Sequence, residues 1–299
     1  MMNNLQETPI EPSNVLATTN GQTKDTFSTE QTQNSDPHHY RLIWFQHFHK
    51  AAGTSIVKLA DINHEVFYSN HDNGNPLDSD GKEIPLWQLS DDELTQFIDH
   101  CENTGITFIA NEWGAPNFEL LSSDPRVVLV TCLRDPLKRF LSNFYFDYWS
   151  GYTNYGDIEN YINSDGCFTM FDYYCRILSG HHDKSEPLDH SQFEVAKSNL
   201  SYFDHIMVLE DKEAFSKLQN FLNWDIKLDN LHQNKSNQFN RRVLKLILSG
   251  RVDLMWRRLS HLRRKPTQEF LHVFQQGNKW DIRLYELSKQ SLAQRTSHE

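Results

Sequence analysis

The stretch FQHFHKAAGTSIVKLA, from Phe45 to Ala60, decides which fold the rest of the chain can have. An aromatic run typical of a buried strand ends at Lys50, passes through a turn of small residues and resumes as a helix from about Thr54. A strand that enters a helix through such a turn directs several backbone N–H groups at one place, where the helix dipole also favours an anion. The stretch therefore predicts a phosphate-binding loop, with its lysine before the glycine and not after it.

Each residue type in this loop has an expected part in binding a phosphate. Lys50 supplies a mobile positive charge, Gly53 permits close approach of the backbone, and the hydroxyls of Thr54 and Ser55 donate hydrogen bonds. The residues expected to contact the phosphate are Lys50, Ala51, Ala52, Gly53, Thr54 and Ser55. The alternative interpretation is an ordinary strand-to-helix turn with an exposed lysine.

Apolar runs predict the strands of the fold, and helical segments separate them. The run from Arg126 to Pro136 is nearly all apolar at its centre, as expected of a central parallel strand. Strands that alternate with helices imply a parallel sheet covered by helices. The predicted strands lie within residues 41–48, 106–113, 126–136 and 203–211. The fold class is therefore predicted to be α/β, with a central parallel sheet of the P-loop type flanked by helices.

Three local signals set expected element boundaries. Ser90 is followed three residues later by Glu93, which predicts a capping box, and Gly105 predicts the end of that helix. Pro136 is placed to begin the next helix, which we expect to run to about Trp149. The segment Ser69–Pro85 is rich in Asn, Asp, Gly and Pro and is predicted to be a loop.

A second candidate site follows the most apolar strand, in LRDPLKRFLSNFY from Leu133 to Tyr145. Arg134 ends that strand at the edge where α/β sheets bind ligands, and Ser142 lies eight residues later in the predicted helix. A guanidinium and a hydroxyl in this arrangement are suited to clamp a second phosphate. The alternative pairs Arg134 with a nearby carboxylate and leaves Ser142 exposed.

Composition bounds the class of protein. A net charge of -11 argues against nucleic-acid binding, and no apolar run approaches the roughly 18 residues of a membrane span. We see no secretory signal, so we expect a cytoplasmic protein without membrane contact, whose four cysteines are reduced. Residues 1–38 are polar and predicted to be a disordered tail, followed by one domain over 39–299.

The two phosphate motifs together resemble those of sulfotransferases that use 3′-phosphoadenosine 5′-phosphosulfate (PAPS). FHKAAGTSI resembles their 5′-phosphosulfate loop, and the spacing of Arg134 and Ser142 is similar to that of their 3′-phosphate motif. Within this family the likeness is greatest to the Golgi-type carbohydrate sulfotransferases and their bacterial relatives. Further segments resemble the group at residues 173–180, 203–222 and 278–288. The resemblance also implies nucleotide contacts by Arg176 and by Asn234, Lys235 and Ser236.

The resemblance implies transfer of a sulfuryl group from PAPS to a hydroxyl of a carbohydrate acceptor, acidic acceptors included. Lys50 is expected to stabilise the charge of the departing phosphate. Glu112, just after the second strand, is the candidate general base, with burial expected to raise its pKa, and His49 is its rival. No metal is expected; His47 and His49 share a strand face but lack an evident third ligand.

Two other functions stay open. A P-loop kinase with a degenerate loop is the first, although no aspartate is evident for a magnesium ion, because Asp135 lies between an arginine and a proline. A nucleotide-binding module without activity is the second. The basic segment 241–265 contains nine Lys or Arg and one Asp, and fits a solvated helix face, a membrane-surface helix or the lining of an acceptor groove.

Overall fold

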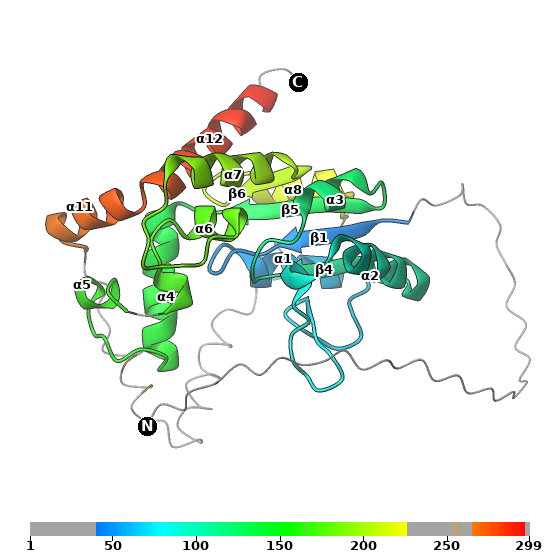
Figure 1. The fold of residues 1–299 in the computed structure, drawn as a ribbon, viewed down its shortest axis with the longest axis horizontal. Coiled ribbons are helices and arrows are strands. Elements are labelled where there is room, and N and C mark those ends of the chain that lie inside the picture. Colours follow the sequence, from blue (N-terminus) through cyan, green and yellow to red (C-terminus); the bar gives the residue numbers. More distant parts are fainter. Residues whose placement is uncertain (1–39, 165, 226–253, 255–256, 258–264, 297–299) are drawn as a thin grey trace, which may run out of the picture. The chain divides into compact units, whose positions relative to one another are not determined.

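The computed structural model describes residues 40–164, 166–225, 254, 257 and 265–296. Its centre is a sheet of four parallel strands in the order β4-β1-β5-β6 (Figure 1). Their bounds are β1 Leu42–Gln46, β4 Phe108–Asn111, β5 Val127–Leu133 and β6 His205–Val208. All four lie within the predicted strand segments, so the α/β class with a parallel sheet flanked by helices is confirmed.

The two inner strands are almost completely buried, which explains their apolar sequences. Every residue of β1 is buried, and it pairs with β4 on one side and β5 on the other, with Phe45 opposite Ala110 and Val130. Parallel strands covered on both faces need apolar side chains on both faces. The carboxyl ends of the four strands consequently lie along one edge of the sheet.

Helices cover the sheet and extend beyond its carboxyl edge (Figure 1). Helix α2 packs against β1, α3 against β5, and α8 and α12 against β6. Helices α1 and α4 follow the two candidate loops. The bounds of these six helices are α1 Gly53–Ile62, α2 Asp91–Thr104, α3 Phe118–Ser123, α4 Pro136–Ser150, α8 Ala214–Leu222 and α12 Lys279–Thr296. The other described helices are α5 Ile158–Tyr161, α6 Tyr173–Ser179, α7 His190–Ser201 and α11 Gln268–Gly277, with 3-10 turns at η1 Leu86–Gln88 and η2 Cys167–Thr169.

The predicted helix boundaries are confirmed in their physical detail. The Ser90 side chain accepts from the Glu93 amide, and the Glu93 carboxylate accepts from the Ser90 amide, which forms the capping box. Gly105 ends α2 in the left-handed conformation at φ 71°, and Pro136 is the first residue of α4. The segment predicted as a loop, Ser69–Pro85, contains a short antiparallel pair, β2 His71–Asp72 with β3 Asn75–Pro76.

A second, smaller core lies beside the sheet. Phe140 and Phe144 of α4 pack with Tyr161 of α5 and with Phe270 and Phe274 of α11. These three helices lie together at one end of Figure 1. Helix α4 therefore connects this cluster with the candidate site, because it carries residues of both.

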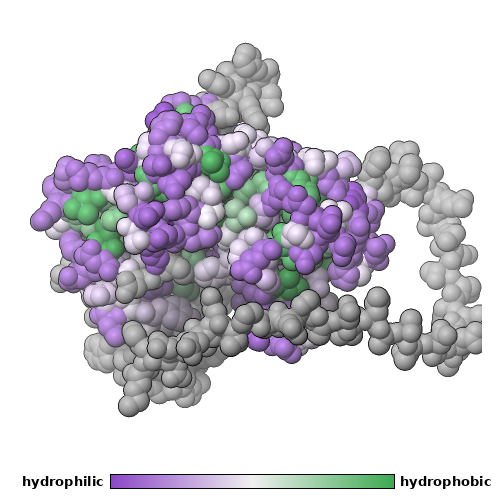
Figure 2. Space-filling model, viewed as in Figure 1, coloured by the Kyte–Doolittle hydropathy of each residue, from purple (hydrophilic) through white to green (hydrophobic). Residues whose placement is uncertain are grey.

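Side chains on the face drawn in Figure 2 are mostly hydrophilic, with small hydrophobic patches separated from one another. Within the part of the chain that the structure describes, no helix has both the length and the apolar character to cross a bilayer. Cys101, Cys132 and Cys175 are buried free thiols.

Several predictions fall on residues that the structure does not describe. They are the tail over 1–38, the segment Asn234, Lys235 and Ser236, and most of the basic segment 241–265. Of that basic segment the structure describes Leu254, Arg257 and Lys265, and Arg257 donates hydrogen bonds to the carbonyl of Thr153 (2.7 Å) and the side chain of Asn154 (3.0 Å).

Candidate active site

A cavity of about 740 Å³ lies at the carboxyl edge of the sheet, where the two candidate loops meet. Most of the residues singled out from the sequence line it: His49, Lys50, Ala52, Gly53, Thr54, Ser55, Glu112, Arg134 and Ser142. The sequence did not predict the other lining residues as part of this site, although His47 was considered as a metal ligand. They are His47, Asn73, Phe146, Leu209, Lys212, Phe215, Ser216 and Gln219. Five of these, from Leu209 to Gln219, follow β6 in a segment already noted for its family resemblance.

The loop after β1 has a backbone shape suited to an anion. Lys50 (φ 64°) and Ala52 (φ 65°) both adopt the left-handed conformation, which costs a residue with a Cβ about 1–3 kcal/mol. Ala51 between them is fully buried, and its N–H donates to the Phe48 carbonyl. Alternation of this kind turns successive N–H groups toward a common point. Helix α1 begins directly afterwards without a side-chain cap, and the Ser55 amide donates to the Ala52 carbonyl at 2.9 Å. The amides of Gly53 and Thr54 precede it in the first turn, where a helix supplies no acceptor of its own.

Gly53 is required by a close neighbour within the protein. A Cβ on Gly53 would lie 1.9 Å from Nε2 of His47, well inside contact distance. The sequence predicted that Gly53 lets the backbone approach a ligand, and the structure shows that the approach is to the His47 ring. Any side chain at position 53 would therefore displace His47, which also lines the cavity.

Two histidines converge on Glu112. His49 Nδ1 lies 2.7 Å from Glu112 Oε1, and His47 Nδ1 lies 3.6 Å from Glu112 Oε2. The Glu112 amide donates to Asn75 Oδ1 at 2.9 Å, which anchors this residue on the hairpin of β2 and β3. Because an ionised carboxylate only accepts hydrogen bonds, His49 carries its proton on Nδ1. Nε2 of His49 has no hydrogen-bond partner among the described residues.

The pKa of Glu112 corrects one prediction. Burial, the largest influence, would raise it as expected, but the hydrogen bond from His49 and the charges of His47, His49 and Lys50 together outweigh burial and lower the pKa. For His47 burial dominates and lowers the pKa, with Glu112 opposing. Glu112 is therefore ionised at neutral pH, and the prediction of a raised pKa was wrong because His49 and Lys50, which oppose the effect of burial, lie far from Glu112 in the sequence.

Lys50 lies next to a second positive charge. Its ammonium group is 4.0 Å from the centre of the Phe146 ring. Burial lowers its pKa, and the nearby Arg134 lowers it further, while Asp147 and Glu112 oppose the shift. A bound anion near Lys50 and Arg134 would oppose both effects on the Lys50 pKa. Its negative charge would replace the solvation lost on burial and would offset the repulsion between the two cations.

Arg134 joins the two candidate loops. It follows β5 directly, and its Nη1 donates to the carbonyl of Lys50 at 3.1 Å. Ser142 lies in α4 and lines the same cavity, so the structure brings the two residues of the second motif to one place. Asp135 caps α4 by accepting from the Lys138 amide at 2.9 Å.

Arg176 is not among the cavity-lining residues. Its guanidinium is 3% exposed and donates to three backbone carbonyls, those of Phe171, Asp183 and Glu186. The family resemblance implied a nucleotide contact for this arginine, whereas in the structure its donors are used to hold the chain around α6. Its neighbours Tyr173 and Tyr174 reach the candidate loops instead.

Aromatic rings form a row through the site. Trp113 lies 5.0 Å from Phe168, Phe168 stacks on His49 at 3.8 Å, and the row continues through Phe146 to Tyr152, by ring-centre distance. Phe146 is 37% exposed and Tyr152 75% exposed, so these two offer ring surface to solvent. Large exposed rings beside a polar cavity are suited to stack against another ring.

Within the described residues, no three His, Cys, Asp or Glu side chains gather in a way that could hold a metal ion.

In comparison with known proteins, no family model matches this chain and no curated protein matches it.

Proposed function

We propose that this protein is a PAPS-dependent sulfotransferase that acts on a hydroxyl group of a carbohydrate. The observation that carries the proposal is the meeting, in one cavity, of the Lys50 loop, the pair Arg134 and Ser142, and the pair His49 and Glu112. These groups match the needs of sulfuryl transfer: two anion-binding loops for a nucleotide with two separate phosphates, and a base for the acceptor. The finer fold assignment, a P-loop-type sheet, is part of this proposal.

The strand order supports one arrangement of the donor and the acceptor. The loop after β1 would hold the 5′-phosphosulfate, and Arg134 after β5 would hold the 3′-phosphate. The nucleoside then lies toward β6, near Phe215 and Gln219. The acceptor approaches from the β4 side, past Glu112 and Asn73. When bound, PAPS supplies an activated sulfuryl group whose bridging S–O bond breaks.

His49 is better placed than Glu112 to take the acceptor proton. Its Nδ1–H donates to Glu112, which leaves the lone pair of Nε2 free to accept a proton. The Glu112 carboxylate then stabilises the imidazolium, as in other carboxylate–histidine pairs. The acceptor oxygen bonds to sulfur, and the electron pair of the broken bond goes to the 5′-phosphate. Lys50 compensates this new charge. Our prediction of Glu112 as the base is therefore replaced by His49 as the base with Glu112 as its partner.

A carbohydrate acceptor is supported by the exposed rings beside His49. Sugar rings present C–H groups on their faces, which pack on aromatic faces while the hydroxyls stay available. Phe146 is 5.7 Å from the His49 ring, and Tyr152 extends the same surface. If the proposal holds, Tyr152→Ala raises the acceptor KM about fivefold and leaves bisphosphate affinity unchanged.

The first test is calorimetric titration with 3′,5′-adenosine bisphosphate, beside AMP and beside ATP with and without magnesium. We expect micromolar affinity for the bisphosphate, independent of metal and well above that for AMP. Preference for ATP with magnesium would replace the proposal with a kinase.

Two variants separate the phosphate sites. Arg134→Ala is expected to weaken bisphosphate binding far more than binding of adenosine 5′-phosphosulfate, which lacks the 3′-phosphate. Lys138→Ala removes an exposed cation four positions later, in α4, and is the matched control that should leave both affinities unchanged. Equal weakening of both ligands by Arg134→Ala would contradict the assignment of Arg134. Binding without release of bisphosphate from PAPS, across neutral and acidic glycans, would indicate a module without activity.

A further inference from the structure

Two adjacent tyrosines at the start of α6 reach the two candidate loops through their hydroxyl groups. The Tyr173 hydroxyl accepts from the amide of His49 at 3.1 Å, in the loop after β1. The Tyr174 hydroxyl accepts from the amide of Arg134 at 3.2 Å and donates to the carbonyl of the same residue at 2.9 Å. One turn of one helix therefore bonds to the backbone of both loops.

The rings of both tyrosines are fixed by packing. Both residues are 0% exposed, and the Phe48 ring packs edge-on against each of them, with ring centres 6.1 Å and 4.9 Å apart. The Arg139 guanidinium lies 4.3 Å from the Tyr173 ring centre. Successive residues of a helix point about 100° apart, so the two hydroxyls diverge toward different loops. The packing of both rings therefore fixes the distance between the two hydroxyl groups.

Helix α6 is in turn fixed to α12 by reciprocal capping. The Asp281 carboxylate accepts from the amides of Tyr174 and Cys175, both at 2.9 Å. The Asp172 carboxylate accepts from the amides of Trp280 (2.9 Å) and Asp281 (3.0 Å). Each aspartate lies at the amino end of the other's helix, where N–H groups lack intrahelical acceptors and the dipole favours a negative charge.

A second connection runs from α12 to the same loop. The Tyr285 hydroxyl donates to Glu210 Oε2 at 2.8 Å, and that oxygen accepts from the amide of Asp135 at 3.0 Å. The backbone of Arg134 and Asp135 thus donates two hydrogen bonds to groups that α6 and α12 position, and accepts one from them. None of these groups lines the cavity.

We propose that Tyr173 and Tyr174 are positioning residues that set the spacing between the 5′-phosphosulfate loop and Arg134, with α12 as their support. Tyr174 then determines how strongly a second phosphate is selected, and Tyr173 determines the placement of His49. The identity of the ligands rests on the proposed function, whereas the contacts themselves do not.

The test compares Tyr173→Phe with Tyr174→Phe, each of which removes one hydroxyl and serves as the other's control. For Tyr174→Phe we expect the ratio of bisphosphate to AMP affinity to fall about tenfold, the size of one hydrogen bond. For Tyr173→Phe we expect this ratio to stay unchanged and kcat to fall about tenfold. Tyr40→Phe, whose hydroxyl bonds the Ile106 carbonyl away from the cavity, should change neither.

Amide hydrogen exchange gives a readout that needs no ligand. Tyr173→Phe should speed exchange at His49 alone, and Tyr174→Phe at Arg134 alone. Asp281→Asn should speed both, whereas Ser288→Ala, which removes a buried hydroxyl bond within α12, should speed neither. If both tyrosine variants lose stability equally, with no selective change in exchange or in affinity ratio, the tyrosines are only structural and the inference is wrong. If wild-type protein binds no nucleotide, the proposed function fails and exchange alone decides the inference.

Discussion

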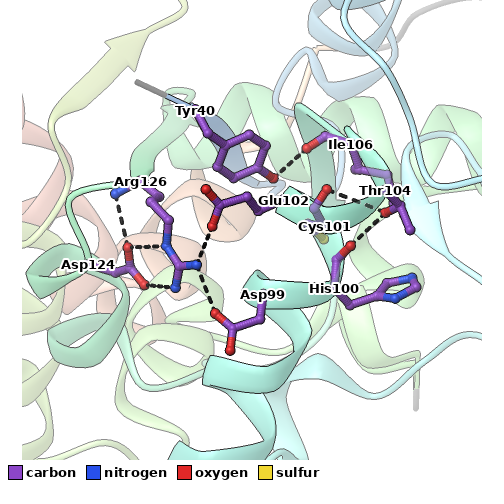
Figure 3. A network of polar contacts seen from close by, with 9 residues as sticks. All are labelled: Tyr40, Asp99, His100, Cys101, Glu102, Thr104, Ile106, Asp124 and Arg126. Carbon is purple, nitrogen blue, oxygen red and sulfur yellow. Dashed lines mark hydrogen bonds and ion pairs between the residues drawn. The ribbon is translucent and has the colours of Figure 1, made fainter. Parts of the chain in front are cut away.

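At the amino edge of the sheet one cation meets three carboxylates, whereas at the carboxyl edge two cations, Lys50 and Arg134, lie together and two histidines converge on the Glu112 carboxylate. Arg126, just before β5, contacts Asp99 (2.8 Å), Glu102 (2.6 Å) and Asp124 (2.7 Å), as Figure 3 shows. At the opposite edge burial, and next the charge of Arg134, lower the pKa of Lys50, and His49 Nε2 lacks a hydrogen-bond partner among the described residues.

The two edges differ in how far their polar groups are paired among the described residues. Each of the three nitrogens of the Arg126 guanidinium donates a hydrogen bond to a carboxylate. The carboxyl edge leaves polar atoms unpaired and cations unneutralised, which costs stability in the free protein. Such a cost is typical of functional sites, and it makes the two edges respond oppositely to mutation.

The largest effect is expected at His49. His49→Ala should lower kcat by about 10²–10⁴, the range for a general base, with little change in bisphosphate affinity. A steady-state assay of bisphosphate release from PAPS, beside calorimetry, measures both. Glu112→Gln keeps the hydrogen-bond acceptor but removes the charge and should cost less than His49→Ala. If Glu112→Gln costs more, the carboxylate itself is the base.

Lys50 gives the next largest effect. Lys50→Met should lower kcat by about 10²–10³ because one electrostatic contact to the leaving group is lost. Since burial and Arg134 both disfavour the charge of Lys50, the melting temperature should stay equal or rise. A fall in both melting temperature and activity would mean that Lys50 belongs with the structural cations, like Arg126.

Arg126 should show the reverse pattern. Arg126→Met is expected to lower the free energy of unfolding by about 2 kcal/mol, because Asp124 (13% exposed side chain) loses its partner, and to leave kcat unchanged. Denaturant unfolding measures the change. Lys197→Met removes a single exposed pair with Glu194 and should cost only a few tenths of that. Loss of activity in folded Arg126→Met protein would show that the two edges are coupled.

The smallest effect concerns the caps between α6 and α12. Burial, and next the charge of Asp281, raise the pKa of Asp172 to about 7. A raised carboxyl pKa means that the folded state binds the proton more tightly, so stability falls as pH rises from about 4 to about 7. Asp172→Asn should remove this fall, so its free energy of unfolding should gain on that of wild type as pH rises from 5 to about 7 and then stay parallel to it. Melting curves across that range measure it, and parallel curves would contradict it.

The sequence predicted the sheet because local patterns determine it. The four strands are apolar runs, and the capping box of Ser90 and the stop at Gly105 need only neighbouring residues. The hairpin within Ser69–Pro85 was missed because its two strands have two residues each, too few for any periodicity.

The site was predicted less completely because its contacts join distant parts of the chain. His49 and Glu112 were named separately, but their pairing spans 63 positions and reverses the expected pKa of Glu112. In YYCRILSG the arginine attracted attention as the charged residue, yet the buried tyrosines before it contact the loops. In a sequence, a pair of tyrosines beside apolar residues is typical of core packing. Only the hydrogen bonds of their hydroxyl groups, which the sequence does not reveal, distinguish these two from ordinary core residues.

The strand order has a consequence for how such a protein diversifies. If the proposed function holds, donor-binding groups come from segments after β1, β5 and β6, while the acceptor side is formed after β4, by the hairpin of β2 and β3 and by the rings of Phe146 and Tyr152. Glu112 joins the two halves at the reaction centre through its contact with His49. Natural selection is then free to remodel the Ser69–Pro85 segment for new acceptors while the nucleotide half stays the same. Duplicated copies of one ancestral chain would diverge first in that segment, and exchange of that segment between copies would transfer acceptor preference.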